Sequence, residues 1–278
     1  MNRTATPATT EALYLDLLKM CLTRYIFPER LRVLSPRRGL SGAVYRPLAH
    51  ALRARHLVLA RELSVSTEDR ARGADFPAEA ETMIGLNRLS HLQHCVEDVL
   101  RQGVPGDLIE TGVWRGGAAI LMRAILKVYG DTERRVWAAD SFQGQPRPDP
   151  RRYPLDDGDG FWKLDLMKVS LAEVRRNFER YELLDDQVRF LVGWFRDTLP
   201  SAPIDRLAVL RLDGDMYEST MEALCALYPR LSVGGYLIVD DYVLPNCRAA
   251  VHDFRAEYGI DEPIETVEWT GAFWQRLH

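Results

Sequence analysis

The chain has 278 residues, of which 46% are hydrophobic and 27% are charged, and this composition is typical of a soluble globular protein. Its formal net charge of −4 does not suggest a nucleic-acid groove or an anionic membrane surface, so we expect neither partner. The four cysteines form no C-x-x-C pair, the N-terminus lacks the apolar core of a signal peptide, and no stretch reaches the roughly 18 apolar residues of a membrane span. We therefore expect a cytoplasmic protein with reduced thiols.

The N-terminal third of the chain is expected to be helical and only partly periodic. Residues 1–10 are polar and predict a disordered tail, and residues 11–105 predict a helical extension. Residues 30–72 are rich in arginine. Two interpretations stay open for them: a static extension or oligomer contact, and a mobile lid over a substrate. We expect a homo-oligomer, with a dimer favoured. A predicted helix through residue 100 carries His91 and His94, which we interpret as surface histidines.

From residue 106 to 278 apolar strands and amphipathic helices alternate, the pattern of a largely parallel, doubly wound α/β sheet of the Rossmann-like type. The expected strands are 107–112, 134–140, 188–193, 206–213, 235–241, 264–268 and 273–277, and the expected helices are 117–129, 170–183, 217–228 and 247–258. The proline-rich segment 143–166 fits neither element. A loop this long is usually functional or disordered, and we interpret it as part of a substrate mouth.

The stretch from Leu108 to Gly117 predicts a strand, a glycine-bearing turn and the start of a helix. Glu110 stands where the Rossmann fingerprint requires its first glycine, and a carboxylate there would repel a phosphate. It suits a cationic or hydroxyl-bearing ligand, such as the amino group or ribose of S-adenosylmethionine, at the strand edge where open α/β sheets bind ligands. The alternative is a tight strand–helix turn without a ligand.

The ends of the next two strands carry further candidate cofactor contacts. Asp140 follows the second strand and is placed to hydrogen-bond ribose hydroxyls, although it is equally suited to cap a helix or close a turn. Trp194 and Phe195 follow the third strand, where an aromatic ring can stack on a purine. Packing in the core is the alternative for both rings.

Carboxylates also follow the fourth and fifth strands, at Asp213, Asp215, Asp240 and Asp241. The ends of parallel strands meet at one edge of a sheet, so these groups would lie beside Glu110. Their mutual repulsion must be offset, and a divalent cation offsets it directly. An all-oxygen set suits Mg²⁺ better than zinc, and a bound metal lowers the pKa of a coordinated hydroxyl. The alternative is that each aspartate caps the helix that follows it.

Several motifs taken together resemble the macrocin O-methyltransferase family, whose members methylate sugar hydroxyls of macrolide and aminocoumarin antibiotics. The similarity runs from about Phe76 to Phe254. It is carried by Thr82-Met83-Ile84-Gly85, Asp107-Leu-Ile-Glu-Thr-Gly-Val-Trp-Arg-Gly-Gly117, Ala139-Asp-Ser-Phe142, Gly193-Trp-Phe-Arg-Asp-Thr-Leu-Pro200, Leu210-Arg-Leu-Asp-Gly-Asp215 and Gly234-Gly-Tyr-Leu-Ile-Val-Asp-Asp-Tyr242. The resemblance implies a class I methyltransferase fold that uses S-adenosylmethionine and Mg²⁺.

The resemblance also assigns roles to particular positions. It implies cofactor contacts from Thr82, Met83, Glu110, Thr111, Gly112, Val113, Trp114, Asp140, Ser141, Phe142, Gly144, Trp194, Phe195 and Asp213. It implies that Asp213, Asp240 and Asp241 hold the metal and that Asp213 is the catalytic base. It further implies a glycosylated small-molecule acceptor. Residues 28–72 and 143–166 do not match closely, and there we expect the choice of acceptor to reside.

Three other functions remain open at this point. Asp213-Gly214-Asp215 is a D-x-D motif of the kind that holds a metal–nucleotide-sugar in a glycosyltransferase, although that function would leave Glu110 and Asp140 unexplained. A methyltransferase-like chain can also serve as a non-catalytic assembly partner through residues 30–72. A catechol-type methyltransferase would use a similar acidic metal site on a flat diol.

Overall fold

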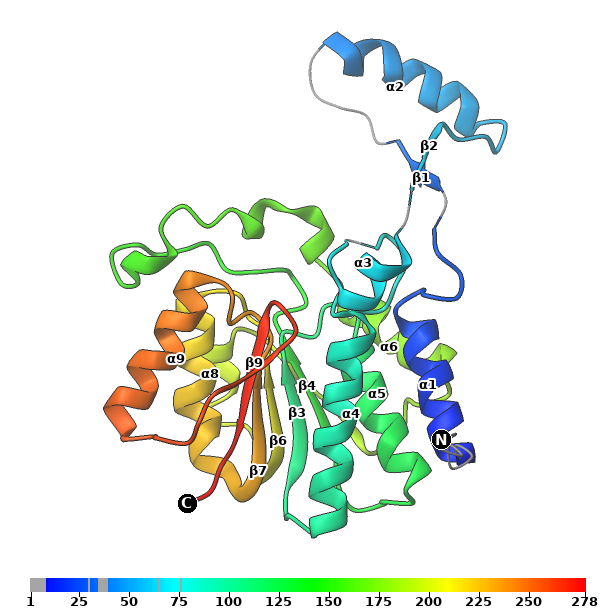
Figure 1. The fold of residues 1–278 in the computed structure, drawn as a ribbon. Helices are drawn as coiled ribbons and strands as arrows, with labels where there is room; N and C mark the ends of the chain where they lie inside the picture. Colours follow the sequence, from blue (N-terminus) through cyan, green and yellow to red (C-terminus); the bar gives the residue numbers. More distant parts are fainter. Residues whose placement is uncertain (1–8, 30, 35–39, 65, 76) are drawn as a thin grey trace, which may run out of the picture.

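The computed structural model describes residues 9–29, 31–34, 40–64, 66–75 and 77–278 of the chain. Within these residues a seven-stranded sheet forms the centre of the molecule, in the order β5-β4-β3-β6-β7-β9-β8 (Figure 1). Its strands are β3 (Asp107–Thr111), β4 (Val136–Asp140), β5 (Val188–Val192), β6 (Leu207–Leu212), β7 (Leu231–Val239), β8 (Glu265–Val267) and β9 (Gly271–Gln275). The pairs from β5 to β7 are parallel, whereas β9 joins β7 and β8 antiparallel. The predicted α/β fold with a largely parallel sheet is confirmed.

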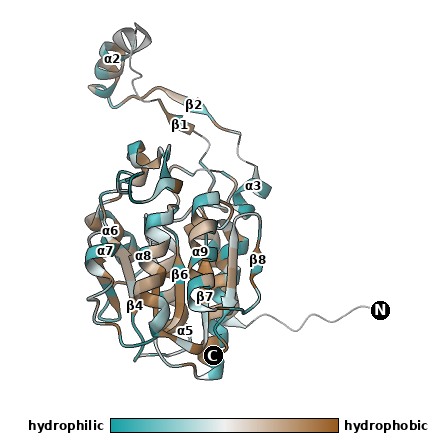
Figure 2. Cartoon of the chain, turned by 90° about the vertical axis from the view of Figure 1, so that its left-hand side faces the viewer, coloured by the Kyte–Doolittle hydropathy of each residue, from teal (hydrophilic) through white to brown (hydrophobic). Residues whose placement is uncertain are grey.

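Helices cover both faces of this sheet. The longer ones are α1 (Thr10–Leu22), α4 (Gly85–Gln102), α5 (Gly117–Val128), α6 (Leu171–Arg180), α8 (Tyr217–Leu227) and α9 (Pro245–Tyr258), and the short α7 spans Phe195–Thr198. Successive strand residues point to opposite faces, so Leu108 packs in the core with α1, α4, α5 and α6, while Ile109 packs with α8 and α9. The apolar strands lie between these two helical layers (Figures 1 and 2).

The predicted N-terminal extension divides into a part that packs on the sheet and a part that does not. Helices α1 and α4 share one core with the sheet, through Leu15, Leu18 and Leu89 among others. Thr9 and Thr10, which the sequence assigned to the tail, cap and begin α1; residues 1–8 lie outside the described residues. Of the two histidines expected at the surface, His94 is exposed, whereas His91 is half-buried because its ring packs against Phe273 with centroids 4.2 Å apart.

The other part of the extension stands away from the body of the molecule as an arm (Figure 1). We define the arm as residues 31–34 and 40–62: it contains β1 (Leu31–Val33) paired with β2 (Ala60–Glu62), and α2 (Leu40–Arg53) between them. The sequence did not predict this hairpin, since two strands of three residues are too short for a periodic signal. The helix α3 (Thr67–Arg72) then returns the chain to α4.

The register of the strands brings their carboxyl ends to one edge. Thr111 pairs with Ala139 and Leu212, and Leu212 pairs with Val239. Val239 pairs in turn with Ala272 of the antiparallel β9, so the turn before β9 lies at this same edge. The broken segment 143–166 contains three short 3₁₀ turns and lies over this edge too (Figure 1). None of the helices in the described ranges is long and apolar enough to cross a membrane.

Candidate cofactor and metal site

A cavity of about 450 Å³ opens at the carboxyl edge of the sheet. It is lined by twelve of the fourteen residues expected to contact the cofactor, namely Thr82, Met83, Glu110, Gly112, Val113, Trp114, Asp140, Ser141, Gly144, Trp194, Phe195 and Asp213. Thr111 and Phe142 do not line it. Thr111 is 1% exposed beneath the edge, and Phe142 packs against Phe190 in the core. The side chains of these two residues are buried in the protein, and a cofactor contact from either of them stays a prediction.

Glu110 lies at the centre of a buried charge network. Its side chain accepts a hydrogen bond from the Ala119 amide at 2.9 Å and pairs with the Arg211 guanidinium at 2.6 Å. Burial raises the pKa of Glu110 to about 8, against the lowering effect of Arg211. Glu110 thus joins the start of α5 to β6, in addition to facing the cavity.

Gly112 is required by the neighbouring strand as well as by the turn. Its φ of 84° is left-handed, and a Cβ atom there would lie 1.7 Å from the carbonyl oxygen of Asp213. The sequence explained this glycine by the approach of a ligand. The structure adds that β3 and β6 come too close at their ends for any side chain.

Asp140 closes the turn beyond β4. Its carboxylate accepts hydrogen bonds from the amides of Val113, at 2.9 Å, and Phe142, at 2.7 Å. This is the turn aspartate that the sequence left open as an alternative, yet the residue also lines the cavity. Both interpretations therefore hold for its position: it orders the β3–α5 turn and faces the space beside Glu110.

The segment 143–166 is held over the cavity by specific contacts. The Trp114 indole donates to the Leu166 carbonyl at 2.8 Å, and Gln145 donates to Asp215. The Asp156 carboxylate, 1% exposed, accepts from the amides of Tyr217, at 2.7 Å, and Glu218, at 3.0 Å, at the start of α8. The sequence gave no signal for Asp156 because its partners lie about 60 residues further along the chain.

Three aspartates meet at the ends of β6 and β7. Oxygen atoms of Asp213, Asp240 and Asp241 lie within 4.8 Å of one another. The strand β7 ends at Val239, so the backbone turns at Asp240 and the two neighbouring aspartates need not point to opposite faces. Burial together with the neighbouring carboxylates raises the pKa of Asp241 well above its usual value. Asp215 lies directly beside this group: its amide donates to Asp241 at 3.0 Å, and its carboxylate is one of the neighbours that raise the pKa of Asp241.

Two buried arginines offset part of this negative charge. The Arg211 guanidinium contacts Asp213 and Asp240 at 2.7 Å each, and Arg88 of α4 contacts the other oxygen of Asp240. Both oxygens of Asp240 are therefore engaged. Asp213 pairs with Arg211 through Oδ2, Asp241 accepts from the Asp215 amide through Oδ2, and the side chains of Asp241 and Asp215 are also in contact. The donor set fits a hard divalent cation between Asp213 and Asp241, whereas each oxygen of Asp240 already pairs with an arginine.

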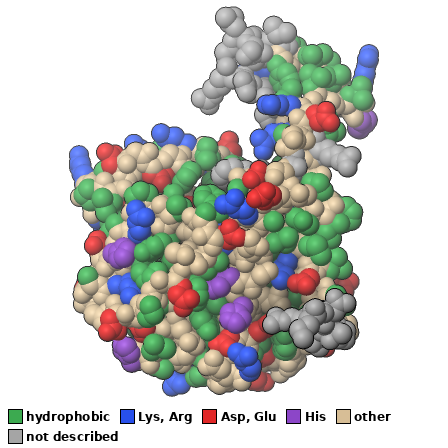
Figure 3. Space-filling view, viewed as in Figure 1, with side chains coloured by type: hydrophobic (Ala, Val, Ile, Leu, Met, Phe, Trp, Pro, Cys, Tyr) green, Lys and Arg blue, Asp and Glu red, His purple; other side chains and the backbone are tan. Residues whose placement is uncertain are grey.

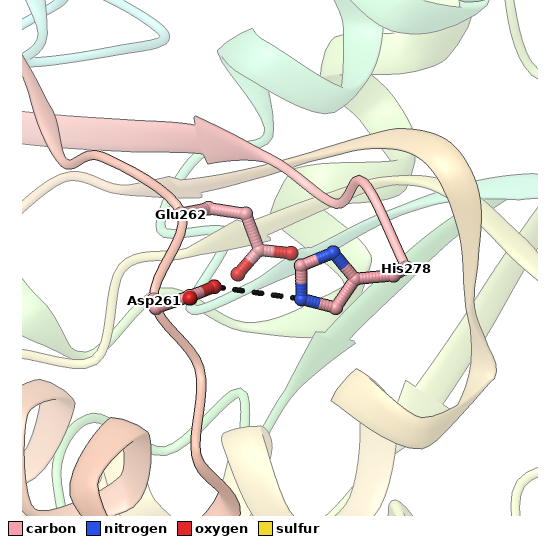
Figure 4. Close-up of side chains that lie close together, drawn as sticks. All are labelled: Asp261, Glu262 and His278. Atoms are coloured by element: carbon pink, nitrogen blue, oxygen red, sulfur yellow. Dashed lines mark ion pairs between the residues drawn. The ribbon is translucent and has the colours of Figure 1, made fainter.

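A second acidic group lies at the opposite end of the sheet, near the C-terminus (Figures 1 and 4). It brings together Asp261, Glu262 and His278, with His278 and Asp261 3.4 Å apart. Asp261 and His278 are exposed, and the Glu262 carboxylate accepts from the Leu277 amide at 3.1 Å. This group lies far from the cavity and takes no part in it.

Several residues in the cavity or buried next to it were not predicted from the sequence. Arg88 lines the cavity and Arg211 is buried beside its carboxylates. Neither was predicted, because an arginine in a helix or strand pattern usually faces solvent. Trp269 and Thr270 belong to a turn between two short strands at the far edge of the sheet, and no motif marked them. Only the packing of α4 and β9 beside β7 brings these four residues together.

The fold and the cavity define a class I methyltransferase. A solved structure described as the O-methyltransferase NovP matches 96% of this chain and 100% of that chain, with a TM-score of 0.83 and 46% sequence identity. The macrocin-O-methyltransferase (TylF) family matches residues 11–276, and the chain belongs to this family. It is an S-adenosylmethionine-dependent O-methyltransferase, so the glycosyltransferase and assembly-partner alternatives are set aside.

Two characterised relatives agree with this assignment. The chain is 50% identical over 264 residues to an 8-demethyl-8-(2,3-dimethoxy-alpha-L-rhamnosyl)-tetracenomycin-C 4'-O-methyltransferase of Streptomyces olivaceus, covering 95% of this chain and 92% of that protein. It is 52% identical over 239 residues to a demethyldecarbamoylnovobiocin O-methyltransferase of Streptomyces niveus, covering 85% and 90%. The resemblance stated from the sequence is confirmed.

Proposed function

We propose that the chain transfers the methyl group of S-adenosylmethionine to a sugar hydroxyl of a glycosylated natural product, within the biosynthesis of an antibiotic. The observation that carries this proposal is the order of residues along the strand edge. Trp194 lies just beyond β5, Asp140 is the last residue of β4, and Glu110 lies near the end of β3. Asp213 and Asp240 follow β6 and β7 directly. A donor half and an acidic acceptor half thus lie side by side.

The donor half has features suited to S-adenosylmethionine. Glu110 and Asp140 offer carboxylates to its amino group and ribose, and the aromatic pair Trp194–Phe195 offers a surface to its adenine. When bound, this cofactor supplies an electrophilic methyl group on sulfur. The role of the protein is then to hold the acceptor oxygen in line with that methyl group, and positioning of this kind accounts for a large part of many rate enhancements.

The acceptor half has features suited to a metal-assisted deprotonation. Asp213 and Asp241 would hold Mg²⁺ between them, and Asp240 would complete the set by sharing one oxygen that now pairs with Arg211 or Arg88. A bound Mg²⁺ would lower the pKa of the acceptor hydroxyl. Asp213, the first carboxylate beyond the donor strands, would act as the base that accepts the proton from this hydroxyl.

The acceptor class is supported by the relatives, whose names specify a rhamnosyl tetracenomycin and a demethylated novobiocin precursor. We therefore expect a sugar already attached to an aglycone rather than a catechol. The experiment is to incubate the enzyme with labelled S-adenosylmethionine and a panel of four acceptors: the demethylated rhamnosyl tetracenomycin, demethyldecarbamoylnovobiocin, macrocin and a catechol. Mass spectrometry should show one added methyl group on a sugar. Methylation of the catechol alone would contradict the proposal.

The metal part of the proposal has its own test. We expect EDTA to abolish turnover and Mg²⁺ to restore it. Asp213→Asn should lose most of kcat, while its affinity for S-adenosylhomocysteine in titration calorimetry stays within about twofold of wild type. Asp261→Asn, in the acidic group at the opposite end of the sheet, is the matched control and should behave as wild type. Full activity after dialysis against EDTA would refute the metal mechanism and leave a metal-free base.

The arm supports a proposed homo-oligomer, with a dimer favoured. Its exposed apolar side chains are Leu31, Val33, Leu34, Leu48, Leu57, Val58 and Leu59, and hydrophobic side chains gather on the projecting arm (Figure 3). So many apolar groups on one small projection are typical of an interaction surface. A second copy of the chain would cover them, and the covered arm could then also act as a lid over the cavity.

A further inference from the structure

The cavity extends beyond the acidic cluster to the turn between β8 and β9. Trp269 and Thr270 of this turn line the cavity together with Val243 and Leu244, which follow the acidic pair of β7. The antiparallel β9 starts at the edge where the parallel strands end, so the turn follows β7 in the order of the rim. The donor half lies over β5, β4 and β3, and this end of the cavity therefore remains for the acceptor.

Thr270 presents an unused hydroxyl at this end. Thr270 lines the cavity but is only 8% exposed, and its buried Oγ1 atom has no hydrogen-bond partner among the residues that the structure describes. Its carbonyl accepts from the Val243 amide at 2.9 Å, which fixes the threonine beside the loop that leaves Asp241. Buried polar groups in native proteins are nearly always paired, so an unpaired hydroxyl on a residue beside the cavity calls for a ligand partner.

Trp269 presents an apolar surface next to this hydroxyl. The side chain remains 47% exposed although it lines the cavity, and its indole donates to the Arg72 carbonyl at 3.2 Å at the end of α3. The preceding Glu268 accepts from Asn87 of α4 and lies 3.7 Å from Arg72. The turn is thus clamped to two helices, and the ring is held in one orientation before any ligand arrives.

We propose that Trp269 and Thr270 form the subsite for the acceptor sugar. The hydroxyl of Thr270 pairs with a ring hydroxyl next to the one that is methylated, and the indole packs on the apolar face of the pyranose. One buried polar group beside a rigid apolar surface is the usual composition of a small-molecule site, and it matches a sugar, which carries both kinds of surface. This inference rests on the proposed function and adds residues outside the two segments that the sequence analysis held responsible for acceptor choice.

The test uses the full-length enzyme, saturating S-adenosylmethionine and whichever panel acceptor the wild type methylates best. Thr270→Val keeps the shape and removes the hydroxyl, and it should lower kcat/KM for the acceptor about tenfold, the effect of one hydrogen bond of roughly 1.4 kcal/mol. Thr270→Ser should retain most of the activity. Trp269→Ala should raise KM for the acceptor at least tenfold, with Trp269→Phe in between. Thr266→Val, on the exposed face of β8, is the control and should match wild type.

A second experiment separates a binding role of the two residues from a structural one. Two acceptor analogues are compared with the parent acceptor, each lacking one of the two hydroxyls next to the methylated position. For the wild type, kcat/KM should be about tenfold lower with one of these analogues than with the parent. Thr270→Val should have the same kcat/KM for that analogue and for the parent. Affinity for S-adenosylhomocysteine should stay unchanged in every variant. If wild type is active and Thr270→Val and Trp269→Ala keep its KM and its discrimination, the subsite is refuted while the proposed function stands. If the wild type methylates no glycosylated acceptor, the subsite and the proposed function are both refuted.

Discussion

At the scale of single residues, the site depends on charges that are buried together. Glu110, Asp213 and Asp240 meet the one guanidinium of Arg211, which is 1% exposed, and Arg88 adds a second cation at Asp240. The arginine is itself held in its charged form, because the three carboxylates raise its pKa further. A cluster of this kind is stable only while every member is present.

We therefore expect Arg211→Gln to be strongly destabilising. Removing one partner of a buried ion pair typically costs about 3–5 kcal/mol, because the remaining charges stay buried without compensation. Urea unfolding followed by circular dichroism measures the loss. Arg123→Gln is the matched control: Arg123 pairs with Asp185 at 2.6 Å, but the Asp185 side chain is 40% exposed, and water can replace the arginine. Equal losses in the two variants would show that the cluster around Arg211 has no special role.

At the scale of elements, the ends of neighbouring strands fix the shape of the site. Gly112, the first residue after β3, lies directly against the carbonyl of Asp213, the first residue after β6. The turn that follows β3 and the turn that follows β6 are therefore in backbone contact. The β8–β9 turn is joined to β7 in the same way, through the Val243 amide and the Thr270 carbonyl. The loops of the site are thus positioned by the sheet and by one another.

A glycine-to-alanine pair tests this contact. Gly112→Ala would place a methyl group 1.7 Å from the Asp213 oxygen, so β3 and β6 must separate at their ends. We expect a loss of several kcal/mol in unfolding free energy and loss of measurable S-adenosylhomocysteine binding in calorimetry. Gly130→Ala also has a positive φ, 69°, but meets nothing within 4 Å, so it should cost only about 1–2 kcal/mol and leave binding intact. Wild-type binding by Gly112→Ala would contradict the proposed geometry.

At the scale of the whole molecule, the arm is the part that the core does not account for. Exposed apolar side chains lie on β1, on α2 and on residues 57–59 before β2, and a two-stranded hairpin of three residues per strand is marginal without a partner. The proposed dimer supplies that partner.

The prediction concerns Leu57 and Val58, which are 54% and 56% exposed. Replacing both with aspartate should convert a wild-type dimer into a monomer, measured by size-exclusion chromatography with light scattering. The matched control is Val233→Asp, which introduces a charge at an equally exposed position (59%) on β7, away from the arm. Identical masses for wild type and the double variant would exclude the arm as the contact, and a monomeric wild type would refute the proposed oligomer.

The sequence alone determined the α/β fold, the positions of the main strands and helices, and the carboxylates that line the centre of the cavity. It could do so because alternating apolar runs mark buried strands, and because the carboxyl ends of parallel strands must share one edge. Glu110, Asp140, Asp213, Asp240 and Asp241 were found in this way, and the family resemblance added Thr82 and Met83.

The tertiary structure decided what depends on contacts between distant segments. Arg88 reaches Asp240 across 152 positions of the chain, and Trp269 reaches Arg72 across 197. No local pattern encodes such pairs, since a periodic signal reports only which face of an element is buried. The structure likewise decided that Thr111 and Phe142 do not line the cavity, that Gly112 is required by a neighbouring backbone, and that the arm stands apart from the core.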